Sequence, residues 1–106
     1  EIGNTDAEGR LILADAIAYM EKEVGPELIV DMATLTGACV VTFGETVAAY
    51  LSTDDKLASV IESASSDTGE KLWRLPFFED YEDRMKSEIA DLSNMSSEKN
   101  AGTISL

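Results

Sequence analysis

The chain has 106 residues, of which 44% are hydrophobic, a size and composition that suit one domain with a modest core. Its 21 acidic residues against 8 basic ones give a formal net charge of −13, so its surface repels phosphate backbones and anionic lipids, and neither nucleic acid nor a membrane is an expected partner. Multivalent cations are the complementary class of partner, and because the sequence has no histidine, any metal site must use oxygen ligands and a His-based catalytic triad is excluded.

The first half of the chain is predicted to alternate helix and strand. A run rich in Leu, Ala and Ile predicts a helix over residues 9–24, which Gly25-Pro26 ends. A β-branched run predicts a buried strand over residues 27–31. Small and hydroxyl-bearing residues follow it at 33–38, a composition typical of backbone that comes close to another group.

The second half continues this alternation with shorter elements. Residues 39–43 fit either a short helix or a strand, and residues 46–52 are predicted to form a strand. Apolar residues at helical spacing predict an amphipathic helix over 54–66, capped by Thr53 or Asp54. The remaining predicted elements are an extended stretch over 72–76, a charged helix over 77–87, a short strand over 89–92 and a polar loop over 93–100.

Strands that alternate with helices predict an α/β architecture with a largely parallel sheet. We expect the chain to form part of a three-layer α/β/α domain with that sheet at its centre. In open sheets of this class, ligands gather at the carboxyl ends of the strands. Residues 4–10 and 33–38 are the segments that we expect at such ends.

Residues 4–10 (NTDAEGR) carry the most informative chemistry. On an extended segment, Asp6 and Glu8 point to the same side and aim carboxylate oxygens at one cation, and Arg10 on that side can meet an anion held nearby. The alternative is that one of the two acids caps the following helix, where the macrodipole favours negative charge, and that Arg10 is an ordinary surface arginine. The spacing alone leaves both interpretations open.

A longer string, residues 4–16 (NTDAEGRLILADA), resembles the signature of the leucyl aminopeptidase (cytosol aminopeptidase) family of two-metal exopeptidases. The resemblance continues, in family order, through 31–39 (DMATLTGAC), 69–76 (GEKLWRLP) and 85–94, with MKS and ADLSN at its ends. It implies that residues 1–106 are a partial catalytic domain, incomplete at both ends. The family's other metal ligands, a lysine and two aspartates, belong to segments that precede this motif.

The resemblance also implies a role for each matched residue. Asp6 and Glu8 would bind metal, with Glu8 bridging two ions, and Arg10 would be catalytic by holding a bicarbonate ion that serves as the general base. The implied substrate-binding residues are Asn4, Ala7, Thr34, Leu35 and Gly37. The implied cofactors are two divalent ions, Zn²⁺ and/or Mn²⁺ with Mg²⁺ as a further candidate. The parent protein would be a cytoplasmic homo-hexamer that removes N-terminal residues, often leucine, from peptides.

A second hypothesis belongs to another class: an acidic, non-catalytic module that serves assembly or cation binding. The intact set of Asp6, Glu8 and Arg10 favours the enzyme. Because the chain would hold less than half of the dinuclear site, we expect it to bind metal weakly and to be inactive by itself. The single cysteine, Cys39, excludes an intrachain disulfide and fits a reducing compartment.

Overall fold

The chain begins with a tight turn that leads directly into a helix. In the computed structural model, which describes residues 1–96, the 3₁₀ turn η1 (Thr5–Ala7) precedes helix α1 (Gly9–Tyr19). The π-helical segment η2 (Met20–Val24) continues α1, and Gly25 ends it at φ 61°, a left-handed conformation that glycine adopts without a Cβ clash. The helix predicted over residues 9–24 is therefore confirmed.

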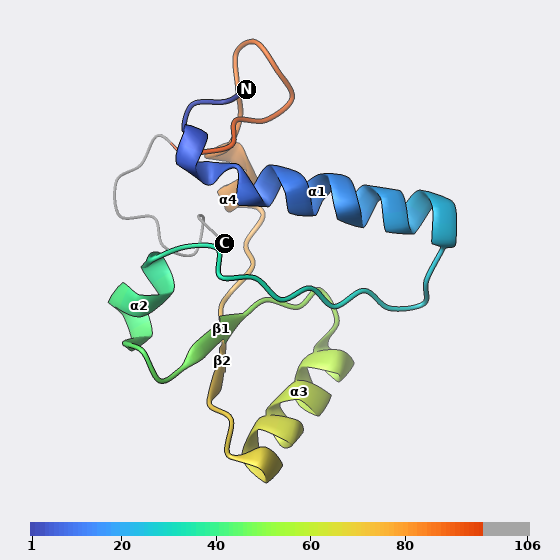
Figure 1. The fold of residues 1–106 in the computed structure, drawn as a ribbon, viewed down its shortest axis with the longest axis vertical. Coiled ribbons are helices and arrows are strands. Elements are labelled where there is room, and N and C mark those ends of the chain that lie inside the picture. The colour runs from blue at the N-terminus through green and yellow to red at the C-terminus, as the bar shows by residue number, and fades with distance from the viewer. Residues whose placement is uncertain (97–106) are drawn as a thin grey trace.

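A two-stranded parallel sheet lies in the middle of the described chain (Figure 1). Strand β1 (Ala48–Tyr50) pairs with β2 (Leu72–Arg74), and Ala49 lies opposite Trp73. Helix α3 (Asp55–Thr68) forms the crossover between them, since two parallel strands need a long connection to run in the same direction. The predicted α/β fold with parallel strands is confirmed.

Helix α3 begins and ends at residues that the sequence marks. The Asp54 carboxylate accepts hydrogen bonds from the backbone N–H groups of Lys56 (2.7 Å) and Leu57 (3.0 Å), so Asp54 is the N-cap of the two candidates. Gly69 follows the last turn at φ 76°. The buried residue of this helix is Ala58, which is 1% exposed. The amphipathic helix predicted over residues 54–66 is confirmed and extends two residues further.

Polar side chains connect α3 to the sheet. The Arg74 guanidinium at the end of β2 donates to the Ser52 carbonyl oxygen (3.0 Å) and pairs with the Asp55 carboxylate (2.8 Å). The Tyr50 hydroxyl on β1 donates to Glu62 Oε1 at 2.9 Å. Burial first, and then this hydrogen bond, raise the pKa of Tyr50 above its usual value.

The strand predicted over residues 27–31 is wrong. Among residues 1–96 this segment is extended but pairs with no other strand (Figure 1), and a strand requires a second backbone to complete its hydrogen bonds. The strand predicted over 46–52 contracts to β1 for the same reason, because β2 offers only three paired positions. The ambiguous run 39–43 is helical and forms α2 (Ala38–Phe43).

The last predicted elements are also shorter than expected. The charged helix predicted over residues 77–87 is a single turn, α4 (Asp80–Asp83), in which like charges three residues apart oppose a longer helix. The strand predicted over 89–92 is wrong, since only one antiparallel bridge, between Lys86 and Leu92, forms there. Residues 93–96 form a loop as predicted, and 97–100 lie outside the described residues.

Large apolar side chains remain exposed over much of the described chain. Met32 is 93% exposed and Val41 is 89% exposed, while Ala58 is the buried hydrophobic residue and Asn94, at 3%, the buried polar one. Within residues 1–96, no helix combines the length and apolar content that a membrane span requires. The described part of the chain therefore has a small core, and its polar contacts define much of its geometry.

Candidate functional site

The segment of residues 4–10 is helical rather than extended. The Asn4 side chain accepts a hydrogen bond from the Asp6 N–H (2.9 Å), and the Ala7 N–H donates to the Asn4 carbonyl oxygen (3.3 Å). The extended geometry expected for Asp6 and Glu8 is therefore wrong, because Asn4 caps the turn and curls the backbone. Asp6 and Arg10 now stand four residues apart on a helical path, a spacing that places two side chains on one face.

Neither acid of this segment caps helix α1. Glu8 occupies the N-cap position of α1 but makes no capping hydrogen bond with its side chain. Asp6 lies within η1, whose cap is Asn4. Both carboxylates are exposed. The capping interpretation of these acids is therefore not supported, and both carboxylates are available for another partner.

A buried asparagine from the far end of the described chain holds this turn in place. Asn94 Oδ1 accepts from the N–H groups of Gly3 (2.9 Å) and Asn4 (3.2 Å). Asn94 Nδ2 donates to the carbonyl oxygens of Asn4 (2.7 Å) and Ala7 (3.3 Å). The amide thereby uses both of its acceptor positions and both of its donor positions. Sequence analysis assigned Asn94 no role, although its ADLSN string was part of the family resemblance.

Two glycines beside the turn allow other side chains to approach it. A Cβ atom on Gly9 would lie 3.0 Å from Leu35 Cδ1, and one on Gly3 would lie 3.0 Å from Met95 Sδ. Any larger residue at either position would push its neighbour away. The glycines therefore bring the segments around residues 35 and 95 against the turn from two directions.

These segments enclose a cavity of about 360 Å³, lined by six of the eight residues predicted to form the site. The six are Asn4, Asp6, Ala7, Arg10, Leu35 and Gly37. Thr36, Met95 and Ser96 complete the lining, whereas the predicted residues Glu8 and Thr34 are not part of it. Sequence analysis did not single out these three residues, and the only signal for them was their position within or beside the matched strings.

The groups of this cavity that can bind a ligand are oxygen atoms and a guanidinium. Arg10 is half-buried with its Nε atom shielded from solvent, and it lies at the second position of α1, near the positive end of the helix dipole. Asp6, which lines the cavity, and Glu8, which does not, are the exposed carboxylates of this segment that are available to a cation. Within the described part of the chain, no three acidic or thiol side chains gather closely enough to hold a metal ion. The chain thus offers two carboxylates of the hard type that divalent cations prefer, but not a complete ligand shell.

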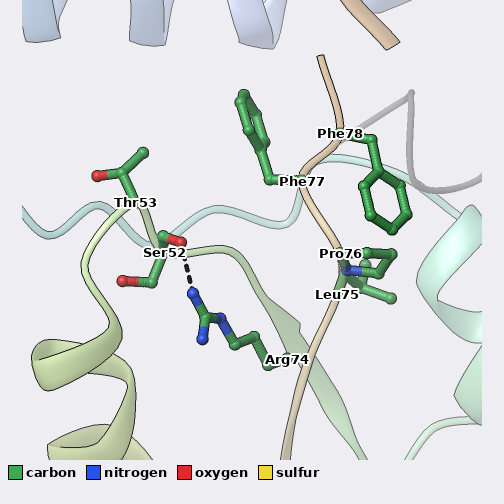
Figure 2. A pocket seen from close by; sticks show the side chains of 7 residues that line it. All are labelled: Ser52, Thr53, Arg74, Leu75, Pro76, Phe77 and Phe78. Atoms are coloured by element: carbon green, nitrogen blue, oxygen red, sulfur yellow. Dashed lines mark hydrogen bonds between the residues drawn. The ribbon is translucent and has the colours of Figure 1, made fainter. Parts of the chain in front are cut away.

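A larger cavity of about 600 Å³ lies at the end of the sheet and contains none of the predicted site residues (Figure 2). Arg74 is the charged residue in its wall, and Figure 2 shows the guanidinium directed at Ser52. The hydrogen bond that the Arg74 guanidinium donates to the Asp55 carboxylate is the main cause that raises the pKa of Arg74. Because this guanidinium is already held by two oxygens, it links β2 to α3 and is not offered to a ligand.

Comparisons with known proteins agree on one family. Residues 1–105 match the family model of the cytosol aminopeptidase family, catalytic domain. A probable cytosol aminopeptidase of Chlorobium luteolum is 58% identical over 104 residues, which cover 98% of this chain and 20% of that protein. The chain therefore spans about a fifth of the length of this relative.

Two solved structures share the fold. The bottromycin maturation enzyme BotP in complex with Mn superposes with a TM-score of 0.88 at 38% identity, covering 98% of this chain and 23% of its own. A mutant of tomato leucine aminopeptidase superposes with a TM-score of 0.84 at 49% identity, covering 91% of this chain and 19% of its own. Matched over residues 1–105 by the model of this family's catalytic domain, the chain belongs to the cytosol aminopeptidase family.

Proposed function

We propose that residues 1–106 are part of the catalytic domain of a metal-dependent aminopeptidase that releases N-terminal residues, often leucine, from peptides. The observation that carries the proposal is the cavity at which Asp6 and Arg10 meet Leu35 and Gly37, residues that are separate in sequence but adjacent in the fold. Membership of the cytosol aminopeptidase family supports the same activity.

Asp6 and Glu8 are proposed to hold two divalent ions, Zn²⁺ and/or Mn²⁺, with Mg²⁺ as a further candidate. Their carboxylate oxygens fit such ions in chemical type, and the related BotP was solved with Mn. Two carboxylates do not complete two coordination shells, so other segments of the enzyme must supply the remaining ligands. When bound, a metal pair supplies an activated water and a polarised substrate carbonyl.

Arg10 is proposed to be the catalytic residue of this chain, as the group that holds a bicarbonate ion. A guanidinium presents parallel N–H donors that match the two oxygens of a carboxylate-like anion. The place of Arg10 in the first turn of α1, on the cavity wall beside Asp6, adds the helix dipole to this attraction. Arg10 would hold this anion at the cavity wall, where it would supply a general base.

The peptide is proposed to lie against the uncharged part of the same wall. Ala7 has a small side chain and Gly37 has none, which leaves space in the cavity for a substrate side chain, and Leu35 adds apolar surface. Asn4 is proposed to contact the substrate as well, while Thr34 lies one residue before the lined segment. The complete enzyme is proposed to be a cytoplasmic homo-hexamer, as the family resemblance implies.

The test is hydrolysis of leucine p-nitroanilide by the complete enzyme with Mn²⁺, for the natural sequence, Glu8→Gln and Glu21→Gln. Glu8→Gln preserves size but removes the ligand charge, so we expect activity and Mn²⁺ affinity to fall by more than about 100-fold. Glu21→Gln removes a charge from η2 that is also exposed, and it should leave both activity and Mn²⁺ affinity unchanged.

The outcome distinguishes the enzyme from the alternative of an acidic, non-catalytic module. Full activity in Glu8→Gln would contradict the metal-ligand role of Glu8. A natural-sequence enzyme that is inactive with Zn²⁺, Mn²⁺ and Mg²⁺ alike would contradict the peptidase and favour the acidic, non-catalytic module.

A further inference from the structure

We propose that Asn94 is a positioning residue of this site, whose side-chain amide fixes the turn that carries Asp6. The inference rests on the proposed function, because it states how the fold fixes the position of a metal-binding carboxylate relative to a cavity wall. Asn94 touches no reacting group itself. It acts through the backbone of residues 3–7.

Burial and saturation of the Asn94 amide distinguish it from an ordinary surface asparagine. The side chain is 3% exposed, and all four of its hydrogen bonds go to backbone groups that lie between 87 and 91 residues away in sequence. A buried amide is tolerated only when it is paired, so these four bonds fix its orientation. Each bond in turn fixes a backbone group of the turn.

These hydrogen bonds connect Asn94 to Asp6 through Asn4. Asn94 holds both the N–H and the carbonyl oxygen of Asn4, which leaves the Asn4 backbone one orientation. The Asn4 side chain in turn accepts the N–H of Asp6 at 2.9 Å. Asn94 also holds the carbonyl oxygen of Ala7, the residue immediately before Glu8. Both proposed metal ligands therefore follow backbone groups that Asn94 orients.

The same residue joins two walls of the cavity. Met95 and Ser96, which come directly after Asn94, line the same cavity as the turn that its amide holds. A change in the Asn94 hydrogen bonds should therefore alter the position of Asp6 and the width of the cavity together. If Asn94 only anchored the first residues of the chain, its hydrogen bonds would not need to affect the position of Asp6 or the width of the cavity.

Only asparagine satisfies this arrangement at this size. Aspartate has the same shape but no N–H, so a carboxylate would face the carbonyl oxygens of Asn4 and Ala7 without donating to them. Serine is shorter and leaves room for water to replace part of the bonding. Glutamine adds a methylene group to a buried position.

Other hydrogen bonds also connect the segments that Asn94 joins, and one of them provides a matched control. The Ser87 hydroxyl donates to the Glu1 carboxylate, and neither residue lines the cavity. Ser87→Ala therefore weakens the connection between the two ends of the described chain without touching the turn of residues 4–7. A purely structural role for Asn94 predicts that both substitutions act alike.

The experiment measures Mn²⁺ affinity of the complete enzyme, by electron paramagnetic resonance of the free ion, together with kcat and KM. The variants are Asn94→Asp, Asn94→Ser, Ser87→Ala and Glu8→Gln. We expect both Asn94 variants to lose about 10- to 100-fold in Mn²⁺ affinity, as for other residues that orient metal ligands, with a larger effect on kcat than on KM. Ser87→Ala should stay within about twofold of the natural sequence. If Asn94→Asp fails to fold, Asn94→Ser decides the result.

Each failure has its own signature. Mn²⁺ affinity that is unchanged in the folded Asn94 variants but lost in Glu8→Gln would overturn the positioning role and leave the proposed function standing. Equal losses in Ser87→Ala and the Asn94 variants would overturn it as well, since they would assign the effect to the connection between segments. Affinity that is unchanged in Glu8→Gln would refute the proposed function, and the positioning role with it.

Discussion

The 106-residue chain by itself exposes more surface than a folded monomer of its mass should. Its accessible surface is 8296 Å², whereas the scaling relation for monomeric proteins gives about 5,800 Å² at 11.4 kDa. The excess of about 2,500 Å² is roughly three times what one partner contributes to a standard protein–protein interface. Because much of the exposed surface is apolar, we predict that the isolated chain self-associates.

Two substitutions test whether apolar surface drives this association. Met32 and Val41 are 93% and 89% exposed, so changing both to lysine removes almost no contact within the chain. Burying one such side chain contributes about 1.5–3 kcal/mol, so losing both from a contact should weaken association by at least about 100-fold. Glu45→Lys is the control, since it changes the net charge by the same two units and leaves the apolar surface intact.

Sedimentation velocity over a wide concentration range provides the measurement. We expect the sedimentation coefficients of the natural chain and of Glu45→Lys to rise with protein concentration. The sedimentation coefficient of the double variant should stay at the value of a monomer up to higher concentrations. A sharp, concentration-independent monomer for the natural chain would refute the surface argument. If Glu45→Lys reduces association as much as the double variant does, charge and not apolar area controls association.

Two further predictions concern local electrostatics and capping. Asp54→Ala removes the acceptor for the Lys56 and Leu57 N–H groups and should destabilise α3 by about 1 kcal/mol, which would be seen as faster amide exchange at both residues. Asp54→Asn should behave almost like the natural residue, because it keeps the capping oxygen. Unchanged exchange in Asp54→Ala would contradict the cap. The hydrogen bond and charge of Lys86 lower the pKa of Asp83, so the stability that this pair contributes is present above the ordinary pKa of Asp83 and is lost as pH falls through its lowered value. Lys86→Ala should return that pKa towards 3.8 in an NMR titration of the carboxyl group, and an unshifted titration would argue against the pair.

The helices were predictable because their determinants are local. The cap at Asp54, the apolar spacing and Gly69 all lie within a few residues of α3, and each acts without help from distant segments. The same holds for α1 and η2, which end at Gly25. The short length of α4 is also determined locally, because the acidic residues of Asp80–Asp83 repel one another within one turn.

Strands were predicted less well because pairing is a long-range property. Residues 27–31 have the β-branched composition of a buried strand, but composition does not provide a partner, and the described residues provide none. β1 and β2 form because α3 returns the chain to the same edge, and the number of paired positions is set by that return. Strand length thus depends on the neighbour as much as on the strand's own residues.

The candidate site shows the same division between local and distant information. Residues 4–10 could be singled out from their own chemistry, but their helical conformation follows from the Asn4 cap, and the position of Asn4 follows from Asn94. No spacing rule connects residues 4 and 94. The family resemblance brought ADLSN into the same string of matches, yet it named no function for the asparagine.

If the proposed function is correct, metal binding and assembly of the catalytic domain are one linked equilibrium. The chain contributes two carboxylates, and the remaining ligands must come from other segments, so high affinity exists only when these segments are together. A ligand that binds only the assembled state stabilises that state by about 2.7 kcal/mol at one hundred times its dissociation constant. Metal ions should therefore raise the thermal stability of the complete enzyme more than that of this chain alone. A residue such as Asn94, which orders the ligand turn before metal arrives, reduces the ordering that the metal itself must impose.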